Sequence, residues 1–515
     1  MNLMKKHKFL AIAALIALGF SSCSDNLDIQ QHGVLNKTSY YKTDEDANEV
    51  LTAVYKDISG LELNCFLIKN ILSDDIWCGC DSHEGDYWKI NDYNFDSSNP
   101  NLESLFSGYY NVIGKCNVVL DNLSGESETV RRAQAEARVA RAWMYFELTT
   151  LWGNPPLVDH LLGSDDSAQP NADPAALWAF MEKDLLDAIN SGMLTQKSSI
   201  DDNTVYHFTK QYAQALLGKV YLWEKKYTEA AKVLDEVINS GLYGLYQGEY
   251  ADIWSVHHEN NRESMFESNF VVDESNPGQC MRLYPAFTGV HPALYDTKLG
   301  DLNLGPVGFS GNQPTSDLYN AFVSEEGVNG YRLNQTIKTP DFMAQHGYKF
   351  KDGMSLYGEG YYMWKNHMET DATGIGTPLD YGNNIRWMRY SEVLLLAAEA
   401  QLGAGNQSKA NQYLNEVRTR AKLPFKTCTL EAIKKEKQLE LCNECVRYQD
   451  LQRWGDAAQT LKNRGEVTPV FGADGKVVWK KLNDTYGYKV GKNEYLPYPA
   501  SEIRINRAIK QNPGW

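Results

Sequence analysis

Apolar residues recur every three or four positions along several long segments of the chain, which is the pattern of helices that bury one face. Residues 128–151 are the clearest case, because they contain no Gly or Pro and carry Trp143 and Phe146 at helical spacing. Gly153 and Pro155 follow and predict the end of this helix. The same pattern predicts further helical segments at 175–189, 212–239, 391–421 and 429–454.

Two of these segments have the spacing of tetratricopeptide units, which are antiparallel helix pairs of about 34 residues. In 212–239 the small Gly218 and Ala230 let two helices approach, and Tyr and Leu side chains fill the groove between them. Residues 391–421 repeat the plan without its aromatic positions. Because isolated pairs separated by long insertions do not form an open superhelix, we predict an all-α fold, with tetratricopeptide-like pairs forming a compact scaffold.

The helical pattern is interrupted by long stretches that are rich in Gly, Asn, Asp and Tyr. They cover residues 60–101, about 240–388 and 463–500. Long irregular insertions in a domain are usually functional. Within the last stretch, Val-Val-Trp at 477–479 follows an Ala-Asp-Gly turn and predicts a hairpin strand.

The first 22 residues have the features of an export signal. Three lysines precede an apolar run from Phe9 to Phe20, and that run is too short to span a bilayer. Ser-Ser-Cys23 resembles a lipoprotein cleavage site, so we expect lipidation of Cys23 and attachment to a membrane; the alternative is a soluble secreted protein with an unmodified Cys23. The acidic residues after Cys23 resemble the surface-export signal of Bacteroidota lipoproteins, which implies the outer membrane and its exterior face.

Composition excludes several classes of protein. The chain has 50 Lys and Arg against 66 Asp and Glu, a formal net charge of -16, so its surface repels a phosphate backbone and we expect no nucleic-acid partner. Aromatic residues make up 12% of the chain, which excludes a disordered protein. The open question is whether these rings are ordinary core or flat binding surfaces.

Metal and cofactor sites are not predicted. Cys442 and Cys445 lie in a helical pattern that places both sulfurs on one face, but no second Cys-x-x-Cys or neighbouring His completes a zinc set. We therefore favour packed thiols or one or two disulfides. The segment 81–86 has hard oxygen ligands but lacks the order of a calcium loop, which favours a solvated turn.

Several motifs in order along the chain resemble the SusD/RagB family. They are Glu136 to Phe146 with the following Leu-Trp-Gly-Asn-Pro-Pro, Trp387 to Ala400, Ile433 to Trp454, and Leu496 to Trp515. The resemblance covers essentially the whole mature chain, so it implies one SusD-like domain over 23–515 after a signal peptide at 1–22. Its helices are expected at about 103–240 and 388–455, and its ligand face at about 60–101 and 240–388.

The resemblance also implies a function. Members of this family are surface lipoproteins that capture nutrients, usually glycans, and hand them to a SusC-like TonB-dependent transporter. On this basis the protein is expected to be a non-catalytic binding protein without a cofactor. A surface glycoside hydrolase and a peptide-binding adaptor are the alternatives, and a hydrolase would need two carboxylates about 5–9 Å apart.

Sugars present flat C–H faces and hydroxyl groups, so a binding site needs Tyr or Trp rings for stacking and polar side chains for hydrogen bonds. The loop-rich stretches supply both, because residues 73–96 and the middle insertion are dense in these types. The predicted glycan-binding residues are Trp77, Trp88, Tyr87, Asp74, Asp81, Asn91, Tyr295 and Trp364.

Overall fold

The computed structural model describes most of the chain, namely residues 41–80, 85–165, 167–271, 288–291, 301–302, 304, 308–367, 369 and 382–515. Cys23 with the leader, and the candidates Asp81 and Tyr295, lie outside the described residues. Seven cysteines fall inside them, and all seven are free thiols. No helix among these residues has the length and apolar character needed to cross a bilayer.

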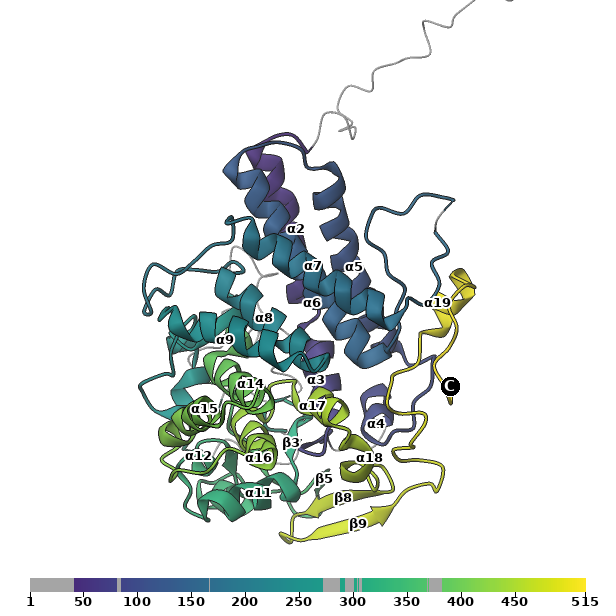
Figure 1. Cartoon of the computed structure of the whole chain (residues 1–515). Coiled ribbons are helices and arrows are strands. Elements are labelled where there is room, and N and C mark those ends of the chain that lie inside the picture. The colour runs from purple at the N-terminus through teal and green to yellow at the C-terminus, as the bar shows by residue number, and fades with distance from the viewer. Residues whose placement is uncertain are drawn as a thin grey trace, which may run out of the picture.

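Antiparallel helices form one half of the molecule, as Figure 1 shows. They are α2 (Asp44–Gly60), α3 (Glu62–Ile71), α4 (Asp86–Asn91), α5 (Pro100–Asn122), α6 (Glu128–Trp152), α7 (Pro174–Asn190), α8 (Lys210–Trp223) and α9 (Tyr227–Asn239). Helices α2, α5, α6, α7 and α8 begin at a side-chain cap, for example Ser127 before α6 and Thr209 before α8. Consecutive helices pack against each other from α5 to α9.

The second helical group follows the irregular middle of the chain. It comprises α14 (Tyr390–Gly403), α15 (Gln407–Arg420), α16 (Leu430–Leu441), α17 (Arg447–Trp454), α18 (Ala457–Thr460) and α19 (Ala500–Ile505). Helix α14 packs on both α9 and α15, so the two groups share one core. The predicted all-α fold and both predicted helix pairs, α8–α9 and α14–α15, are confirmed.

Close approach of neighbouring helices, both within the pair α8–α9 and between α9 and α14, depends on glycine. A Cβ atom added at Gly218 in α8 would lie 2.6 Å from the side chain of Leu234 in α9. A Cβ at Gly403 in α14 would lie 2.4 Å from the ring of Tyr227. Both distances are below van der Waals contact, so the two glycines set the spacing of their helices.

The expected single helix over 429–454 is wrong. Helix α16 ends at Leu441, and α17 begins only at Arg447. Between them Asn443 and Cys445 have positive φ angles of 61° and 64°, so the two sulfurs do not share a helix face. Tertiary contacts hold this turn, because Asn312 donates to Asn443 Oδ1 at 2.8 Å and the backbone N–H of Cys445 donates to Asn70 Oδ1 at 3.2 Å.

The three irregular stretches of the chain contain short elements. They are η1 (Tyr250–Trp254), η2 (Val256–His258), α11 (Ser316–Glu326), α12 (Tyr331–Asn334), α13 (Pro340–Gln345), and the strands β1 (Ile76–Trp77), β2 (Ser264–Ser268), β3 (Gln313–Pro314), β4 (Ile337–Lys338), β5 (Ser355–Tyr357), β6 (Tyr362–Met363), β7 (Ile385–Arg389), β8 (Val467–Gly472) and β9 (Val477–Lys481). All pairs are antiparallel: β1–β3, β2–β7, β4–β6 and β5–β8–β9. The hairpin predicted around 477–479 is therefore confirmed as β8–β9.

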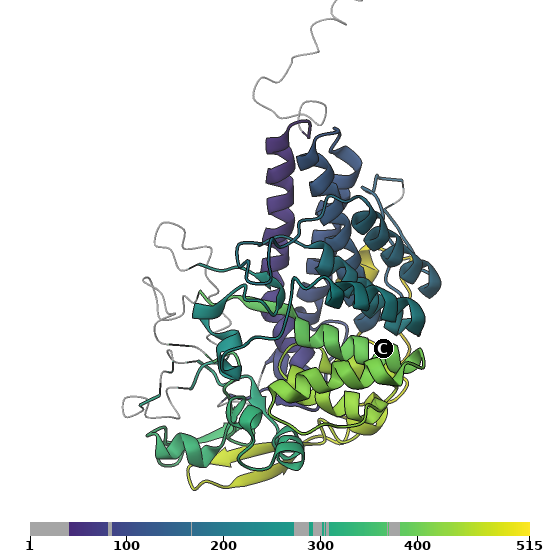
Figure 2. The same ribbon diagram turned by 60° about the vertical axis from the view of Figure 1, so that its left-hand side comes forward.

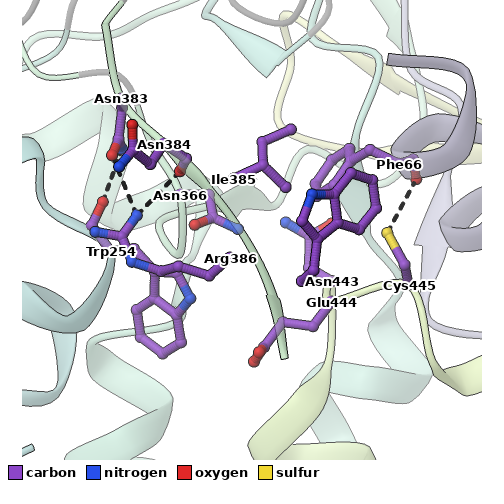
Figure 3. A pocket seen from close by; sticks show the side chains of 11 residues that line it. Phe66, Trp254, Asn366, Asn383, Asn384, Ile385, Arg386, Asn443, Glu444 and Cys445 are labelled. Atoms are coloured by element: carbon purple, nitrogen blue, oxygen red, sulfur yellow. Dashed lines mark hydrogen bonds between the residues drawn. The ribbon is translucent and has the colours of Figure 1, made fainter. Parts of the chain in front are cut away.

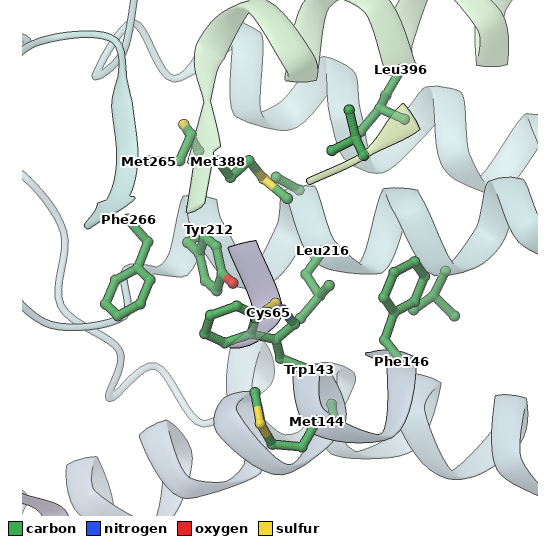
Figure 4. Close-up of a cluster of buried hydrophobic side chains, with 14 of the residues drawn as sticks. Cys65, Trp143, Met144, Phe146, Tyr212, Leu216, Met265, Phe266, Met388 and Leu396 are labelled. Carbon is green, nitrogen blue, oxygen red and sulfur yellow. The ribbon is translucent and has the colours of Figure 1, made fainter. Parts of the chain in front are cut away.

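Much of the aromatic content lies in the helical core. Figure 4 shows Trp143, Phe146, Tyr212 and Phe266 among buried Leu and Met side chains. The rings of Tyr212 and Phe266 are 5.4 Å apart, and those of Trp143 and Phe266 are 5.9 Å apart in an edge-to-face arrangement. Such pairs add to the free energy of burial, so these rings stabilise the scaffold.

A buried ion network joins the second helical group to the middle of the chain. Glu440 in α16 accepts from Arg332 in α12 at 2.8 Å, from Arg389 in β7 at 3.1 Å, and from Arg420 in α15. Burial raises the pKa of Glu440, but the three arginines outweigh this and lower it to about 2. The carboxylate therefore stays charged and fixes four elements relative to one another.

Candidate functional site

Trp77 lies in the strand β1 and has only 6% of its surface exposed. Its Nε1 donates to Glu359 Oε1 at 2.8 Å, and the guanidinium carbon of Arg464 lies 3.8 Å from the ring centroid. The structure thus places this predicted glycan-binding residue inside the fold, where Trp77 belongs to the strand β1 that pairs with β3.

Trp88 and Asn91, both in α4, are buried as well. Trp88 is 4% exposed, and its ring meets the ring of Tyr357 edge to face at 5.3 Å. Asn91 is fully buried, where its Oδ1 accepts from the backbone N–H of Cys78 at 2.9 Å and from Arg464 at 3.0 Å. Neither side chain presents an open face, since α4 packs its inner side on the core.

Asp74 forms a two-pronged ion pair with Arg447 at the start of α17. Arg447 Nε and Nη2 donate to the two carboxylate oxygens, each at 2.8 Å. Both acceptor oxygens are therefore engaged within the fold, and Asp74 ties the loop after α3 to the C-terminal helices.

Trp364 is half-buried in a second, smaller cluster near α13. His367 stacks on its ring at 3.9 Å, and the ammonium of Lys338 lies 4.8 Å from the ring centroid. Burial lowers the pKa of His367 to about 4, so the stacked imidazole is neutral at pH 7. The Trp364 ring is thus covered by its own neighbours.

Tyr87 is the last of the predicted glycan-binding residues that the structure describes. It belongs to a cluster of aromatic and aliphatic side chains on the loop-rich side of the molecule. We call this group the loop-face cluster; its members are Leu63, Phe66, Tyr87, Phe270, Ile385 and Trp387. Tyr87, Phe270 and Trp387 are only partly buried. They come from three elements far apart in sequence, so the fold gathers exposed aromatic surface here.

Hydrogen bonds fix the orientation of two of these rings. Tyr87 donates its hydroxyl to Asn64 Oδ1 at 2.5 Å, and Trp387 Nε1 donates to Ser268 Oγ at 2.8 Å. The inner edge of Trp387 packs edge to face on Trp143 at 5.3 Å. Trp387 is therefore anchored in the core on one side and partly open on the other.

A pocket of polar side chains borders the cluster, and Figure 3 shows how they lie. Its lining includes Trp254, Asn366, Asn383, Arg386, Trp387 and Asn443. The cavity volume is about 20 Å³, which is room for one water-sized group and too little for a sugar ring. A single hydroxyl could enter it while a ring rests outside.

Two hydrogen-bond donors at this pocket are unsatisfied. Trp254 Nε1 and Asn443 Nδ2 are buried, and no acceptor among the described residues meets either of them. The residues themselves are 3% and 2% exposed. Because a buried donor without an acceptor costs about 1–3 kcal/mol, the pair is suited to an incoming oxygen.

Arg386 is held by the chain around it. Its guanidinium donates to Asn383 Oδ1 at 3.2 Å, to the carbonyl of Asn384 at 3.0 Å and to the carbonyl of Ser255 at 3.1 Å. On the same segment, the backbone N–H of Asn384 donates to Glu259 at 2.7 Å, and burial raises the pKa of that carboxyl to about 7. The pocket wall is thus rigid.

Trp254, Phe270 and Trp387 fall within the stretch 240–388 in which the sequence predicts a ligand face, and Asn443 falls outside it; none of the four was among the predicted glycan-binding residues. Trp387 was recognised only as the start of a family motif. Its immediate neighbourhood, Asn-Asn-Ile-Arg-Trp at 383–387, already combines amide, guanidinium and indole groups. That combination was the available signal; the contributions of Trp254 and Asn443 depend on tertiary structure and have no local signal.

Comparison with known proteins gives a consistent result. The family model described as "SusD family" matches residues 309–515, and the model described as "Starch-binding associating with outer membrane" matches residues 36–222. SusD-like protein P2 of Formosa agariphila is 24% identical over 99% of this chain and 100% of its own length. A SusD-like protein of Bacteroides ovatus is 26% identical over 100% of this chain and 99% of its own.

Solved structures show the same architecture. A laminarin-binding SusD-like protein superposes with a TM-score of 0.77 at 28% identity, covering 92% of this chain and 100% of that chain. Surface glycan-binding protein A from Bacteroides thetaiotaomicron, in complex with laminarihexaose, has a TM-score of 0.73 at 24% identity, covering 91% and 99%. At 24% identity, the similarity to the second protein shows a shared fold only.

Proposed function

The chain belongs to the SusD/RagB family, and we propose that it captures oligosaccharides or polysaccharides at the cell surface without cleaving them. The observation that carries this is the loop-face cluster beside the small pocket. Partly open rings of Tyr87, Phe270 and Trp387 suit the apolar face of a sugar ring. The unsatisfied donors of Trp254 and Asn443 suit one of its hydroxyl oxygens.

Laminarin is the first ligand to test. It is what the 28% identical structural relative binds by its name, and the two chains align over nearly their full lengths. A neutral polysaccharide also fits the chemistry of the pocket, because Arg386 already donates to three acceptors of the fold and is not free to bind an anion.

Location and partners follow from the family and from the leader. We propose that lipidated Cys23 anchors the protein in the outer membrane, facing the exterior, and that a SusC-like TonB-dependent transporter receives the glycan. Support comes from the lipoprotein-like leader and from the outer-membrane association in the name of the family model that matches 36–222. Recovery of a β-barrel transporter with the purified full-length lipoprotein tests the partnership.

The experiment that tests capture is calorimetry of the mature protein against laminarin, laminarihexaose and a panel of other glycans, with product analysis of the same samples. We expect binding with no change in glycan length. Shortening of any bound glycan would establish the hydrolase alternative instead. Absence of binding to every glycan, together with binding to peptides, would favour the adaptor.

A further inference from the structure

We propose that Trp479, on the hairpin β8–β9, is a second glycan contact that stacks on one pyranose ring of a long polysaccharide. This contact is separate from the loop-face cluster and rests on the proposed function, because the occupant is the same captured glycan. It would lengthen the surface over which a polymer is held without enlarging the main site.

Exposure singles out this residue. The chain has twelve tryptophans, all of which lie among the described residues, and Trp479 is the one whose side chain is exposed, at 50%. The other eleven are buried or partly buried. An indole left half in water forgoes much of the ~1.5–3 kcal/mol that burial of a large apolar side chain gives, and a ligand that covers it recovers this free energy.

The exposed ring rests on a fixed support. Trp77 meets Trp479 edge to face at 6.1 Å, with 65° between the ring planes. Trp77 is itself held by the hydrogen bond to Glu359 and by the guanidinium of Arg464 described above. Because this support is buried and hydrogen-bonded, it orients the Trp479 ring before a ligand stacks on it, which favours affinity.

Strand alternation argues for a sugar ring and against a protein partner. Val478 is 59% exposed, but neighbouring residues of a strand point to opposite faces, so Val478 and Trp479 do not form one apolar patch. The residue paired with Trp479 on β8 is the buried Pro469. A protein interface needs a large contiguous surface, whereas stacking on a pyranose needs one aromatic ring.

A lysine on the same face of the strand as the ring supplies a hydrogen-bond donor for a sugar hydroxyl. Lys481 lies two positions after Trp479 and is exposed, whereas Lys480 points to the opposite face. Lys481 forms an ion pair with Asp484 at 2.6 Å, while the ammonium of Lys480 lies 5.5 Å from the ring centroid of Tyr357. An ammonium donates but does not accept, and a hydroxyl oxygen is a suitable partner.

The hairpin also lies at a favourable end of the molecule. Figures 1 and 2 both place β8–β9 at the end opposite the start of α2. Helix α2 is the first described element, and the chain runs from its start toward Cys23. Trp479 therefore lies away from the end that leads to the proposed membrane anchor, where a polysaccharide in solution can reach it.

The test uses the mature protein and three substitutions: Trp479→Ala, Trp479→Tyr and Val478→Ala. The probes are laminarin and laminarihexaose, followed by calorimetry and by affinity electrophoresis. We expect Trp479→Ala to weaken laminarin binding by about three- to tenfold, Trp479→Tyr to retain most of it, and Val478→Ala to match the wild type. Laminarihexaose, which is much shorter than laminarin, should show a smaller change.

Iodide quenching of tryptophan fluorescence gives an independent readout. Laminarin should protect the wild-type protein from quenching, and this protection should be smaller in Trp479→Ala. If the wild type binds laminarin and Trp479→Ala binds it equally well, the second contact is overturned while the proposed function stands. Equal losses in Trp479→Ala and Val478→Ala would also overturn it, and a wild type that binds no glycan would overturn both.

Discussion

Two tryptophans on the loop-rich side differ in what surrounds their rings, and this difference decides their roles. Trp88 is 4% exposed against Tyr357 and the core, so its indole contributes to stability. Trp387 is anchored by Trp143 and Ser268 on its inner side and is partly open on the other, so its indole can meet a ligand.

The buried position of Trp88 predicts a large effect on stability. We expect Trp88→Ala to lower the free energy of unfolding by about 3–5 kcal/mol, because it removes a large side chain from a packed core. Trp479→Ala is the matched control, since its indole is half-exposed and packs only at its edge on Trp77, so the loss should be smaller, at about 1 kcal/mol. Urea unfolding at pH 7 measures both, and equal losses would contradict the burial described here.

At this scale the sequence shows which residue types gather in a stretch but not which way each ring points. Trp77, Tyr87, Trp88 and Asn91 lie within fifteen positions of one another, and the structure buries three of them while leaving Tyr87 partly open. The direction is set by distant partners such as Arg464, which lies against Trp77 and bonds to Asn91. The residues near Trp77 and Asn91 in the sequence do not indicate that a distant residue such as Arg464 will pack against them.

At the scale of elements, the helix pairs could be predicted because the small and large residues that set the distance between two helices recur at fixed positions in the sequence. Gly218 illustrates this, since its lack of a side chain is what admits Leu234. The break between α16 and α17 was not predictable, because the helical periodicity continues through it. Its cause lies in contacts from Asn312 and Asn70, which are remote in sequence.

Substitution by alanine should change the stability of the protein in opposite directions at two helical glycines, one in close contact with a neighbouring helix and one with open space around it. We expect Gly218→Ala to destabilise the protein by about 1–3 kcal/mol, because the new methyl group overlaps Leu234. In α5, Gly114→Ala should instead stabilise by about 0.5–1 kcal/mol, because nothing lies within 4 Å of the added atom and alanine favours helix. Thermal unfolding of both variants measures this difference. A change of the melting temperature in the same direction in both variants would contradict the prediction.

For the whole molecule, the ion network around Glu440 joins the helical scaffold to the loop-rich side. Arg389 connects it directly to the pocket, because this arginine also donates to Glu444 at 2.7 Å and Glu444 lines the pocket wall. The geometry of the proposed ligand face therefore depends on charges buried in the core.

Glu440→Gln is expected to lower the free energy of unfolding by about 3–5 kcal/mol, because it leaves buried arginines short of a counter-charge. The pKa of Glu440 is about 2 when folded, below its ordinary value of 4.5. A lowered pKa stabilises above pH 4.5, and this contribution is lost as the pH falls from 4.5 to 2. Urea unfolding between pH 4.5 and pH 2 should show that the free energy of unfolding falls less steeply with decreasing pH in the variant than in the wild type. The same pH dependence in both proteins would contradict the role assigned to Glu440.

The central claim is that Trp387 and the pocket beside it contact a captured glycan. The most direct measurement is the laminarin affinity of Trp387→Ala, compared with Trp364→Ala, which removes a half-buried indole that His367 already covers. With both variants folded, we predict a loss of at least about tenfold for Trp387→Ala and less than about twofold for Trp364→Ala. Unchanged affinity in Trp387→Ala, or the larger loss in Trp364→Ala, would contradict the claim.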